Sequence, residues 1–403
     1  MPAAAILAAA ALLSLALALH PFTTYPLSLA ALARLRPRPV RGEAVAPAWR
    51  VAMCVCAYNE APVIAARIDN MIALRAAVPD LDILVYVDAA TDGTAEIVRG
   101  YGDAIRAVVS PARQGKTAGM NTLVGMTDAD LIVFSDANVM FAPDALTHLL
   151  APFGDATVGC VCGNLIYTGA ANATADVGSL YWRLEERIKD LESRTGSIVG
   201  ADGSIFAIRR RLHHAPPGDL IDDMYVSLSI LCAGYRIVRA GHALAYEEAV
   251  SRPAEEFRRK IRIACQAFNV HRALRRALRQ LSPLDRYKYI SHKLLRWMTI
   301  YLLALAALCF VLALAVAGAP GAAVVLACVI VAGVAVLLMY PVGPLGKIGS
   351  ILGAFVATGL GVLRSLTGEK FQTWNPPDSA RAAADLTWTE AGSQAAASRG
   401  GGH

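Results

Sequence analysis

Long apolar stretches constrain the fold of this chain more than any other feature of its sequence. The first covers residues 3–19, breaks at His20-Pro21 and continues over residues 25–35. Two more cover residues 298–317 and 322–340. A helix needs about 20 apolar residues to cross a bilayer, so we expect an N-terminal anchor kinked near its prolines and a later membrane hairpin. A cleaved signal peptide is the alternative for the N-terminus.

Basic residues flank these stretches and indicate their orientation. Arginines cluster within residues 34–41, and the basic segment 292–297 precedes the hairpin. Because arginine and lysine mark the cytoplasmic side of a membrane, we expect the region between them to be cytoplasmic. A fourth apolar segment, residues 348–363, is marginal in length for a span, and we expect an interfacial or re-entrant helix there. The basic run 258–279 is typical of a helix on an anionic lipid surface, and we expect no nucleic acid partner.

The region between residues 51 and 246 alternates strand-like and helix-like patterns. Such alternation predicts an α/β domain with a mostly parallel, doubly wound sheet. The expected strands cover residues 51–56, 82–87, 105–109, 130–136 and 158–166, and the expected helices cover residues 62–77, 94–101, 119–126 and 143–150. The cysteines lack Cys-x-x-Cys spacing, so we expect small buried side chains and no zinc site.

Polar side chains follow several of these strands. Asp136 and Asn138 come directly after the apolar run 130–134. In open α/β sheets, ligands bind beyond the carboxyl ends of the strands. Two hard oxygen ligands at that edge suit Mg²⁺ or Mn²⁺ held against a diphosphate. A turn or a helix cap is the alternative for this pair.

Other strand ends carry comparable groups. The segment 57–60 follows the first strand, Asp88 ends the second, and Lys116 and Asn121 come from the following loop and helix. Capping of the next helix is the alternative for Asn59, and a solvated side chain is the alternative for Lys116. Converging on one sheet edge, these groups predict a site for a ligand that carries hydroxyls, a planar base and phosphates.

In this order, the motifs resemble those of membrane-bound family 2 glycosyltransferases of the bacterial exopolysaccharide, cellulose-synthase-like and poly-N-acetylglucosamine-synthase-like group. The resemblance extends from the first apolar stretch to the segment 373–377. It implies a GT-A-like cytoplasmic domain with α-helical transmembrane and interfacial segments, in the bacterial inner (cell) membrane. The implied parts are an anchor (1–36), a glycosyltransferase domain (46–250), basic interfacial helices (251–293), a transmembrane hairpin (294–340), an interfacial or short membrane helix (345–366) and a partly disordered cytoplasmic tail (367–403).

The resemblance also implies roles for individual residues. The nucleotide contacts would be Ala57, Tyr58, Asn59, Glu60, Asp88, Lys116, Asn121, Arg259 and Arg262. Asp136 and Asn138 would bind the divalent cation, Mg²⁺ or Mn²⁺. The donor sugar and acceptor would meet Gly200, Ala201, Asp202, Gly203 and Gln266. Asp223, with Asp222 beside it, would be the general base, and a helix N-cap is the alternative for this pair.

Two departures from the family pattern bear on function. Asn138 is neutral where the family carries a second aspartate, and no Arg-Trp follows Gln266, which puts processive polymerisation in doubt. We therefore expect inverting transfer of a sugar from a nucleotide-sugar donor, a UDP-sugar in the first instance, to a lipid-linked or membrane-delivered glycan acceptor. The alternatives are a processive synthase that extrudes its polymer, for which a homo-oligomer could form the channel, and a catalytically silent nucleotide-sugar-binding regulator.

Overall fold

A single mixed sheet organises the domain that follows the first apolar stretch. The computed structural model describes residues 2–41, 49–168, 173–248, 253–339 and 343–373 of the chain. The sheet has eight strands in the order β3-β2-β1-β4-β7-β6-β8-β5. In that order the strands are Arg106–Ser110, Asp82–Asp88, Val51–Ala57, Leu131–Asp136, Ile205–Arg209, Val158–Thr168, Arg236–Glu248 and Val139–Phe141.

Parallel pairing dominates the sheet, as the alternating sequence pattern predicts. Strands β3, β2, β1 and β4 are mutually parallel, and β6 is parallel to β8. Strand β7 runs antiparallel between β4 and β6, and the short β5 runs antiparallel to β8. The expected strands all form. The sequence patterns do not place β5, β7 or β8. Strands β5 and β7, with three and five residues, are too short to show a clear period.

Helices cover both faces of the sheet and bury two separate cores. One core packs α3 (Ala61–Ala73), α4 (Thr94–Gly100) and α6 (Ala145–Leu150) on the first face. The other packs α5 (Lys116–Gly125), α8 (Asp222–Cys232) and α9 (Pro253–Leu278) on the second face. Side chains alternate in β1, so that Met53 enters the first core and Cys54 the second. This is the period-two pattern of a strand buried on both faces.

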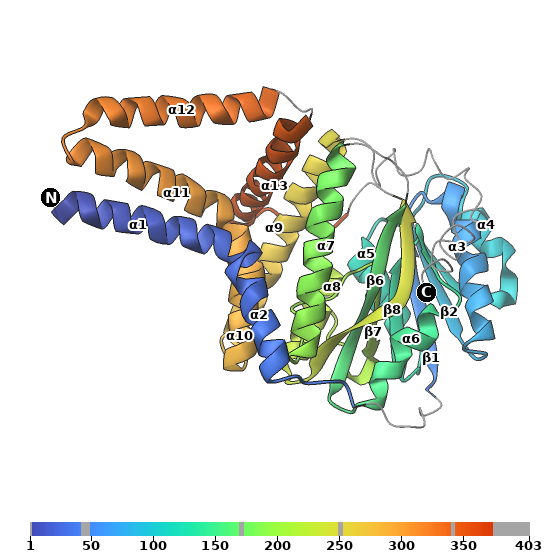
Figure 1. The fold of residues 1–403 in the computed structure, drawn as a ribbon. Helices are drawn as coiled ribbons and strands as arrows, with labels where there is room; N and C mark the ends of the chain where they lie inside the picture. Colours follow the sequence, from blue (N-terminus) through green and yellow to red (C-terminus); the bar gives the residue numbers. More distant parts are fainter. Residues whose placement is uncertain (1, 42–48, 169–172, 249–252, 340–342, 374–403) are drawn as a thin grey trace, which may run out of the picture.

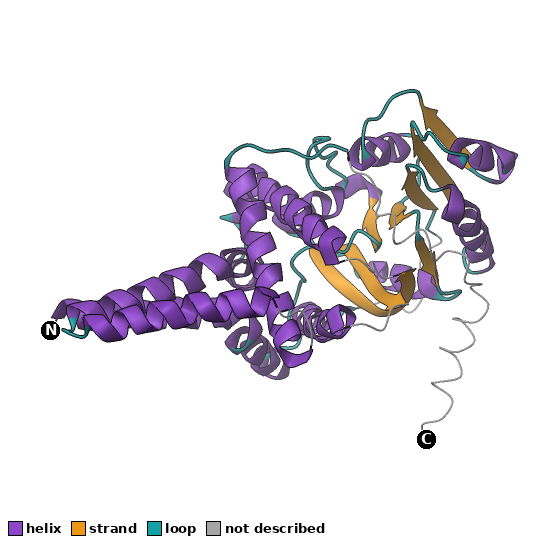
Figure 2. Ribbon diagram, turned by 90° about the horizontal axis from the view of Figure 1, so that it is seen from above, coloured by secondary structure: helices purple, strands orange, loops and turns teal. Residues whose placement is uncertain are grey.

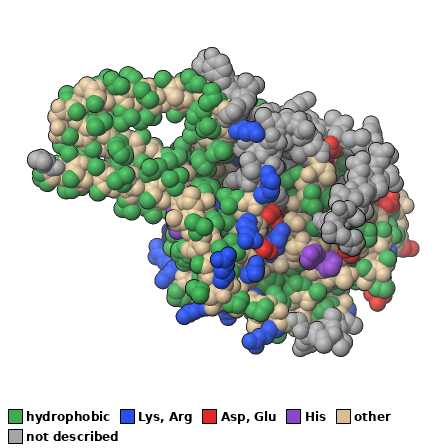
Figure 3. Space-filling view, in the orientation of Figure 1, with side chains coloured by type: hydrophobic (Ala, Val, Ile, Leu, Met, Phe, Trp, Pro, Cys, Tyr) green, Lys and Arg blue, Asp and Glu red, His purple; other side chains and the backbone are tan. Residues whose placement is uncertain are grey.

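The apolar stretches form long helices that project from the sheet domain (Figures 1 and 2). The first is α1 (Pro2–Leu19), followed by a 3₁₀ turn at His20–Phe22 and α2 (Thr24–Leu35), so the chain does bend at its prolines. The hairpin consists of α11 (Leu295–Val316) and α12 (Pro320–Met339). Apolar side chains cover these helices in Figure 3.

Four helices of the described chain are long and apolar enough to cross a membrane. The fourth is α13 (Gly343–Leu366), which has 24 residues and is therefore longer than the 16-residue apolar core that suggested an interfacial helix. Helix α13 packs against α9, which ties the long apolar helices to the sheet domain. Most of the expected tail, including residues 374–377 of the terminal motif, lies outside the described residues.

Candidate active site

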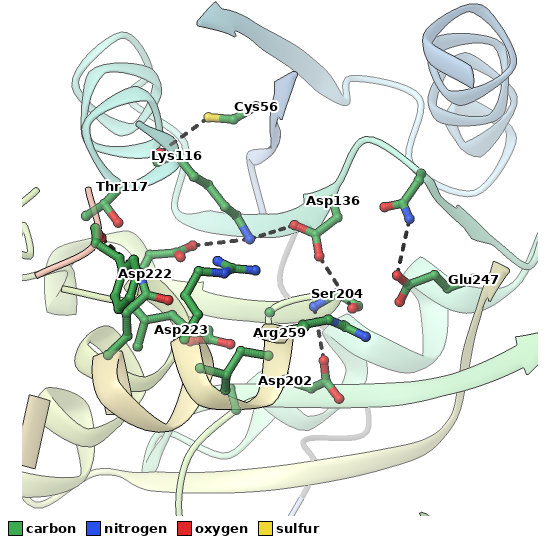
Figure 4. Close-up of a pocket in the computed structure, with 18 of the residues that line it drawn as sticks. Cys56, Lys116, Thr117, Asp136, Asp202, Ser204, Asp222, Asp223, Glu247 and Arg259 are labelled. Atoms are coloured by element: carbon green, nitrogen blue, oxygen red, sulfur yellow. Dashed lines mark hydrogen bonds and ion pairs between the residues drawn. The ribbon is translucent and has the colours of Figure 1, made fainter. Parts of the chain in front are cut away.

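A large cavity opens at the carboxyl ends of β1 and β4. Its volume is ≈ 1070 Å³, at the upper end of the range of about 300–1,000 Å³ for small-ligand sites, so it has room for two ligands. Predicted site residues that line it are Glu60, Lys116, Asp136, Asn138, Gly200, Ala201, Asp202, Gly203, Asp222, Asp223, Arg259, Arg262 and Gln266. Groups far apart in the sequence therefore meet here (Figure 4).

Lys116 bridges the two acidic sides of this cavity. It is the first residue of α5, and its Nζ lies 2.6 Å from Asp136 Oδ1 and 3.6 Å from Asp222 Oδ2. Burial alone would lower the pKa of Lys116, but the negative charges of Asp136, Asp222 and Asp223 raise it overall. The side chain is therefore a stable ammonium that can face the phosphates of a ligand.

Asp223 faces the glycine segment that precedes β7. A Cβ atom placed on Gly203 would lie 2.8 Å from Asp223 Oδ2, so only a glycine allows this approach. Burial, together with the neighbouring charge of Asp222, raises the pKa of Asp223 to about 7, with Lys116 opposing the shift. The cap position of α8 is Ile221, so neither aspartate is the N-cap that the alternative required. A carboxyl group with a pKa near neutrality is suited to general-base catalysis.

Three oxygen-bearing side chains could hold a divalent cation. Asp136 Oδ1 is taken by Lys116, but Oδ2 has only a long contact of 3.5 Å from Ser204 Oγ. Asn138 donates its amide nitrogen to Glu247 Oε1 at 3.2 Å, which leaves its amide oxygen for another partner. Within the described chain, Glu247 Oε2 is buried without a hydrogen-bond partner. Hard oxygen donors of this kind fit Mg²⁺ or Mn²⁺.

Glu247 was not predicted from the sequence. It lies near the end of β8, and burial raises its pKa to about 7. The described residues contain no group of three or more His, Cys, Asp or Glu side chains that could hold a metal ion. Asp136 and Glu247 supply only two carboxylates, and Mg²⁺ sites commonly use one or two with substrate phosphates completing the shell. Residues 243–247 read Ala-Leu-Ala-Tyr-Glu, which shows no apolar/polar alternation, so the inward position of Glu247 follows from the burial pattern of β8 alone.

Several predicted nucleotide contacts lie outside the cavity lining and support its walls. The carboxylate of Asp88, 1% exposed, accepts hydrogen bonds from the backbone N–H groups of Gln114 (2.7 Å) and Gly115 (3.0 Å). Asp88 therefore shapes the loop before Lys116. Asn59 and Asn121 bind neighbouring loops, and Ala57 lies within β1. The Arg113 guanidinium lies 3.3 Å from the ring centroid of Tyr58, a stack that could continue onto a planar base.

The segment after α13 returns across the mouth of the cavity. Phe371, Gln372 and Thr373 line it, and the Phe371 carbonyl accepts a hydrogen bond from Gln266 Nε2 at 3.0 Å. Gln372 Nε2 in turn donates to the Gln114 carbonyl at 3.3 Å. We call residues 367–373 the C-terminal strap. Sequence patterns gave no indication of this placement, because the segment has no periodicity of its own.

Gly115 marks the closest approach of the strap to the loop before Lys116. It has φ +90°, and a Cβ atom there would lie 2.1 Å from the Gln372 carbonyl oxygen. Gly115→Ala is therefore expected to displace the strap or the loop and to weaken donor binding by about tenfold or more, since 1–3 kcal/mol of strain is typical of such positions. Equilibrium binding of a nucleotide sugar measures this effect.

Gly125→Ala in the same helix is the matched control. A Cβ atom at Gly125 would have nothing within 4 Å. We expect this variant to bind the donor like the wild type and to be slightly more stable, by about 0.5–1 kcal/mol. Equal donor affinity of the Gly115→Ala variant and the wild type would contradict the proposed contact.

Comparisons with known proteins show which proteins this chain is similar to. Residues 53–215 match the family described as Glycosyl transferase family 2. An N-acetylglucosaminyltransferase of Sinorhizobium fredii is 24% identical over 267 residues, which cover 62% of this chain and 63% of that protein. The O-antigen chain rhamnosyltransferase WbaN of Salmonella anatum is 28% identical over 188 residues, covering 44% of this chain and 59% of that protein. The chain thus spans less than two thirds of the length of these relatives.

A solved structure shows the same fold over most of the chain. The mannosyltransferase PcManGT of Pyrobaculum calidifontis, in complex with GDP-Man and Mn²⁺, has a TM-score of 0.67 and 22% identity, covering 90% of this chain and 100% of that one. The sheet domain therefore has a GT-A-like fold, as the sequence motifs implied. Together, the family match and the relatives support a glycosyltransferase.

Proposed function

We propose that this chain transfers a sugar, with inversion, from a nucleotide-sugar donor to a lipid-linked or membrane-delivered glycan acceptor in bacterial polysaccharide biosynthesis. The single observation that carries the proposal is the arrangement of Asp223 and Lys116 in one cavity. Asp223 is a buried carboxyl group with a pKa of about 7, and Lys116 is an ammonium held by Asp136. One group can accept a proton while the other faces phosphate.

The chemistry follows from these positions. An acceptor hydroxyl loses its proton to Asp223 while its oxygen forms a bond to the anomeric carbon of the donor sugar. The bond from that carbon to the diphosphate oxygen breaks, and the nucleoside diphosphate leaves. Lys116, Arg259 and Arg262 line the same cavity and take up the charge that develops on the leaving group. A divalent cation held by Asp136 and Asn138, with Glu247 beside them, would add to this charge stabilisation.

Two further observations support the choice of donor and location. The similar mannosyltransferase was solved with a nucleotide sugar and Mn²⁺, and the relatives act as sugar transferases in two bacteria. Four helices of suitable length and hydropathy support a multi-pass protein of the inner membrane with a cytoplasmic catalytic domain.

A UDP-sugar is the first donor to test. Membranes containing the chain, supplied with a panel of radiolabelled nucleotide sugars, should incorporate label from one of them, and no incorporation from any would contradict the proposal.

The product is expected to be short. Helix α9 carries Gln266, but no Arg-Trp pair follows it, and the Gln266 amide is hydrogen-bonded to the C-terminal strap. Helix α9 therefore lacks the tryptophan that processive members of the resembled group carry after this glutamine. Purified enzyme given donor and lipid acceptor should yield products with one or very few added sugars by mass spectrometry. A ladder that extends to high mass with donor alone would instead support a processive synthase.

A further inference from the structure

A buried charge cluster joins the membrane helices to the sheet domain. Two carboxylates of α7 (Ala173–Arg194), Glu185 and Glu192, flank His292. The His292 ring nitrogens lie 3.0 Å from Glu185 Oε1 and 2.7 Å from Glu192 Oε1. Arg296 donates to Glu185, and the Tyr25 hydroxyl donates to Glu192. Both carboxylates of the cluster are therefore fully engaged.

Lys293 lies beside this cluster, close enough for electrostatic attraction to Glu185 and Glu192. Within the described chain, no hydrogen bond or ion pair reaches its ammonium group. The side chain is half-buried and lines the cavity. The neighbouring Lys288 donates to two backbone carbonyls, those of Glu192 and Ser197. Two carboxylates thus face three basic side chains, those of Lys288, Lys293 and Arg296. The ammonium group of Lys293 lines the cavity and has no hydrogen-bond partner within the described residues, so it is available to an anionic ligand.

The position of Lys293 places that ligand next to the reacting groups. Lys293 lines the same cavity as Asp223. A Cβ atom on Gly200 would lie 3.9 Å from Lys293 Cε, and one on Gly203 would lie 2.8 Å from Asp223 Oδ2. The Gly200–Gly203 segment therefore forms one wall that runs from Lys293 to the proposed base. A group bound at Lys293 can hold the acceptor while its hydroxyl reaches Asp223.

The same residue also lies at the membrane end of the cavity. It belongs to a π-helical segment, Ile290–Leu294, that leads directly into α11. The candidate span Pro283–Val316 includes this segment. Single π-helical turns inside longer helices are frequent at functional sites. In Figure 3 basic and acidic side chains gather on the domain close to the base of the apolar helices.

We propose that Lys293 binds the phosphate of a phosphate-bearing membrane lipid that carries the acceptor, so that the apolar tail lies along the membrane helices. The proposal rests on the proposed function and narrows its acceptor from any membrane-delivered glycan to a lipid phosphate or diphosphate. A compact lysine ammonium is a common phosphate ligand. A neutral glycolipid offers this ammonium no charged partner, whereas a phosphate can accept a charge-assisted hydrogen bond from it.

Binding of farnesyl phosphate tests the proposal on the full chain in phosphatidylcholine nanodiscs. Radiolabelled farnesyl phosphate is expected to bind about ten- to a hundredfold more weakly to Lys293→Met than to the wild type, which is the usual size of one charge-assisted contact. Lys293→Arg should retain most of the affinity. Arg99→Met, which removes an exposed cation of α4 in the sheet domain, is the matched control and should bind like the wild type.

Competing ligands distinguish a lipid phosphate from free phosphate. Nucleotide-sugar binding distinguishes this lipid site from the proposed sugar transfer. Farnesol should bind poorly, and inorganic phosphate at equal concentration should not displace farnesyl phosphate. Equal binding of farnesol, efficient displacement by inorganic phosphate, or unchanged affinity of the folded Lys293→Met variant would each overturn the lipid phosphate site. Nucleotide-sugar binding measured on the same samples should not differ between Lys293→Met and the wild type. If the wild type binds farnesyl phosphate through Lys293 but transfers no sugar, the result contradicts the proposed function and leaves the lipid site standing.

Discussion

Asp223→Asn is expected to lower the rate of sugar transfer by about 10²–10⁴, the usual cost of losing a general base. The amide keeps the shape of the side chain beside Gly203, so nucleotide-sugar affinity should stay within a few-fold of the wild type. Single-turnover transfer and equilibrium binding of the donor measure the two quantities separately. Asp222→Asn is the matched control: this neighbour faces Lys116 at 3.6 Å, so we expect a smaller loss of rate.

The pH profile provides a second readout of the same residue. Burial raises the pKa of Asp223 to about 7, and a base must be deprotonated to act. The wild-type kcat/KM should therefore rise with pH through about 7 and then level off. The kcat/KM of the Asn variant should not show this rise. Retention of more than half of the wild-type turnover in the Asn variant would place the base elsewhere, with Asp222 as the first candidate.

The stability that Asp223 contributes to the folded protein should fall as pH rises, whereas catalytic activity should increase. The pKa is higher in the folded protein than in the unfolded chain, so the folded state holds the proton more tightly. The stability from this group is present below about pH 4 and is lost as pH rises through about 7. The Asn side chain resembles the protonated acid, and the variant should therefore melt no lower than the wild type at pH 8. A normal thermal transition would also show that the loss of activity is not a loss of folding.

Removal of divalent cations with excess EDTA is expected to abolish transfer, and Asp136→Ala should weaken nucleotide-sugar binding by about tenfold or more. The reason is that the departing diphosphate develops negative charge, which a bound cation would neutralise. Asp136 Oδ2 has only a 3.5 Å contact from Ser204 and is the oxygen best placed for an ion. Calorimetric titration with Mn²⁺ measures the loss of metal binding without relying on activity.

Asn138→Asp is the matched variant for this prediction. It adds a carboxylate at a position whose amide now donates to Glu247. The extra negative charge should keep or tighten Mn²⁺ binding, while Asp136→Ala should weaken it. Full transfer activity in excess EDTA would contradict metal dependence and would assign charge stabilisation to Lys116 with Arg259 and Arg262.

Local sequence patterns were sufficient for most of the fold. Apolar runs of bilayer length predicted the projecting helices, because span length follows directly from the rise per residue. Alternating strand and helix patterns predicted the mostly parallel sheet. The strand-end rule then brought Lys116 and Asp136 to one edge, since parallel strands place their carboxyl ends together. The role of Asp223 came from the family resemblance, and its tests are still to be made.

Only the tertiary structure decided which distant groups complete the cavity. Glu247 reaches Asn138 because β8 pairs with β5, and Lys293 enters the cavity from the π-helical segment that leads into α11. Asp88 became a support for the loop because two backbone N–H groups bind its carboxylate. Periodicity records which face of its own element a side chain occupies. It carries no record of which remote element packs against that face, so these contacts arise only when the sheet and the long apolar helices assemble.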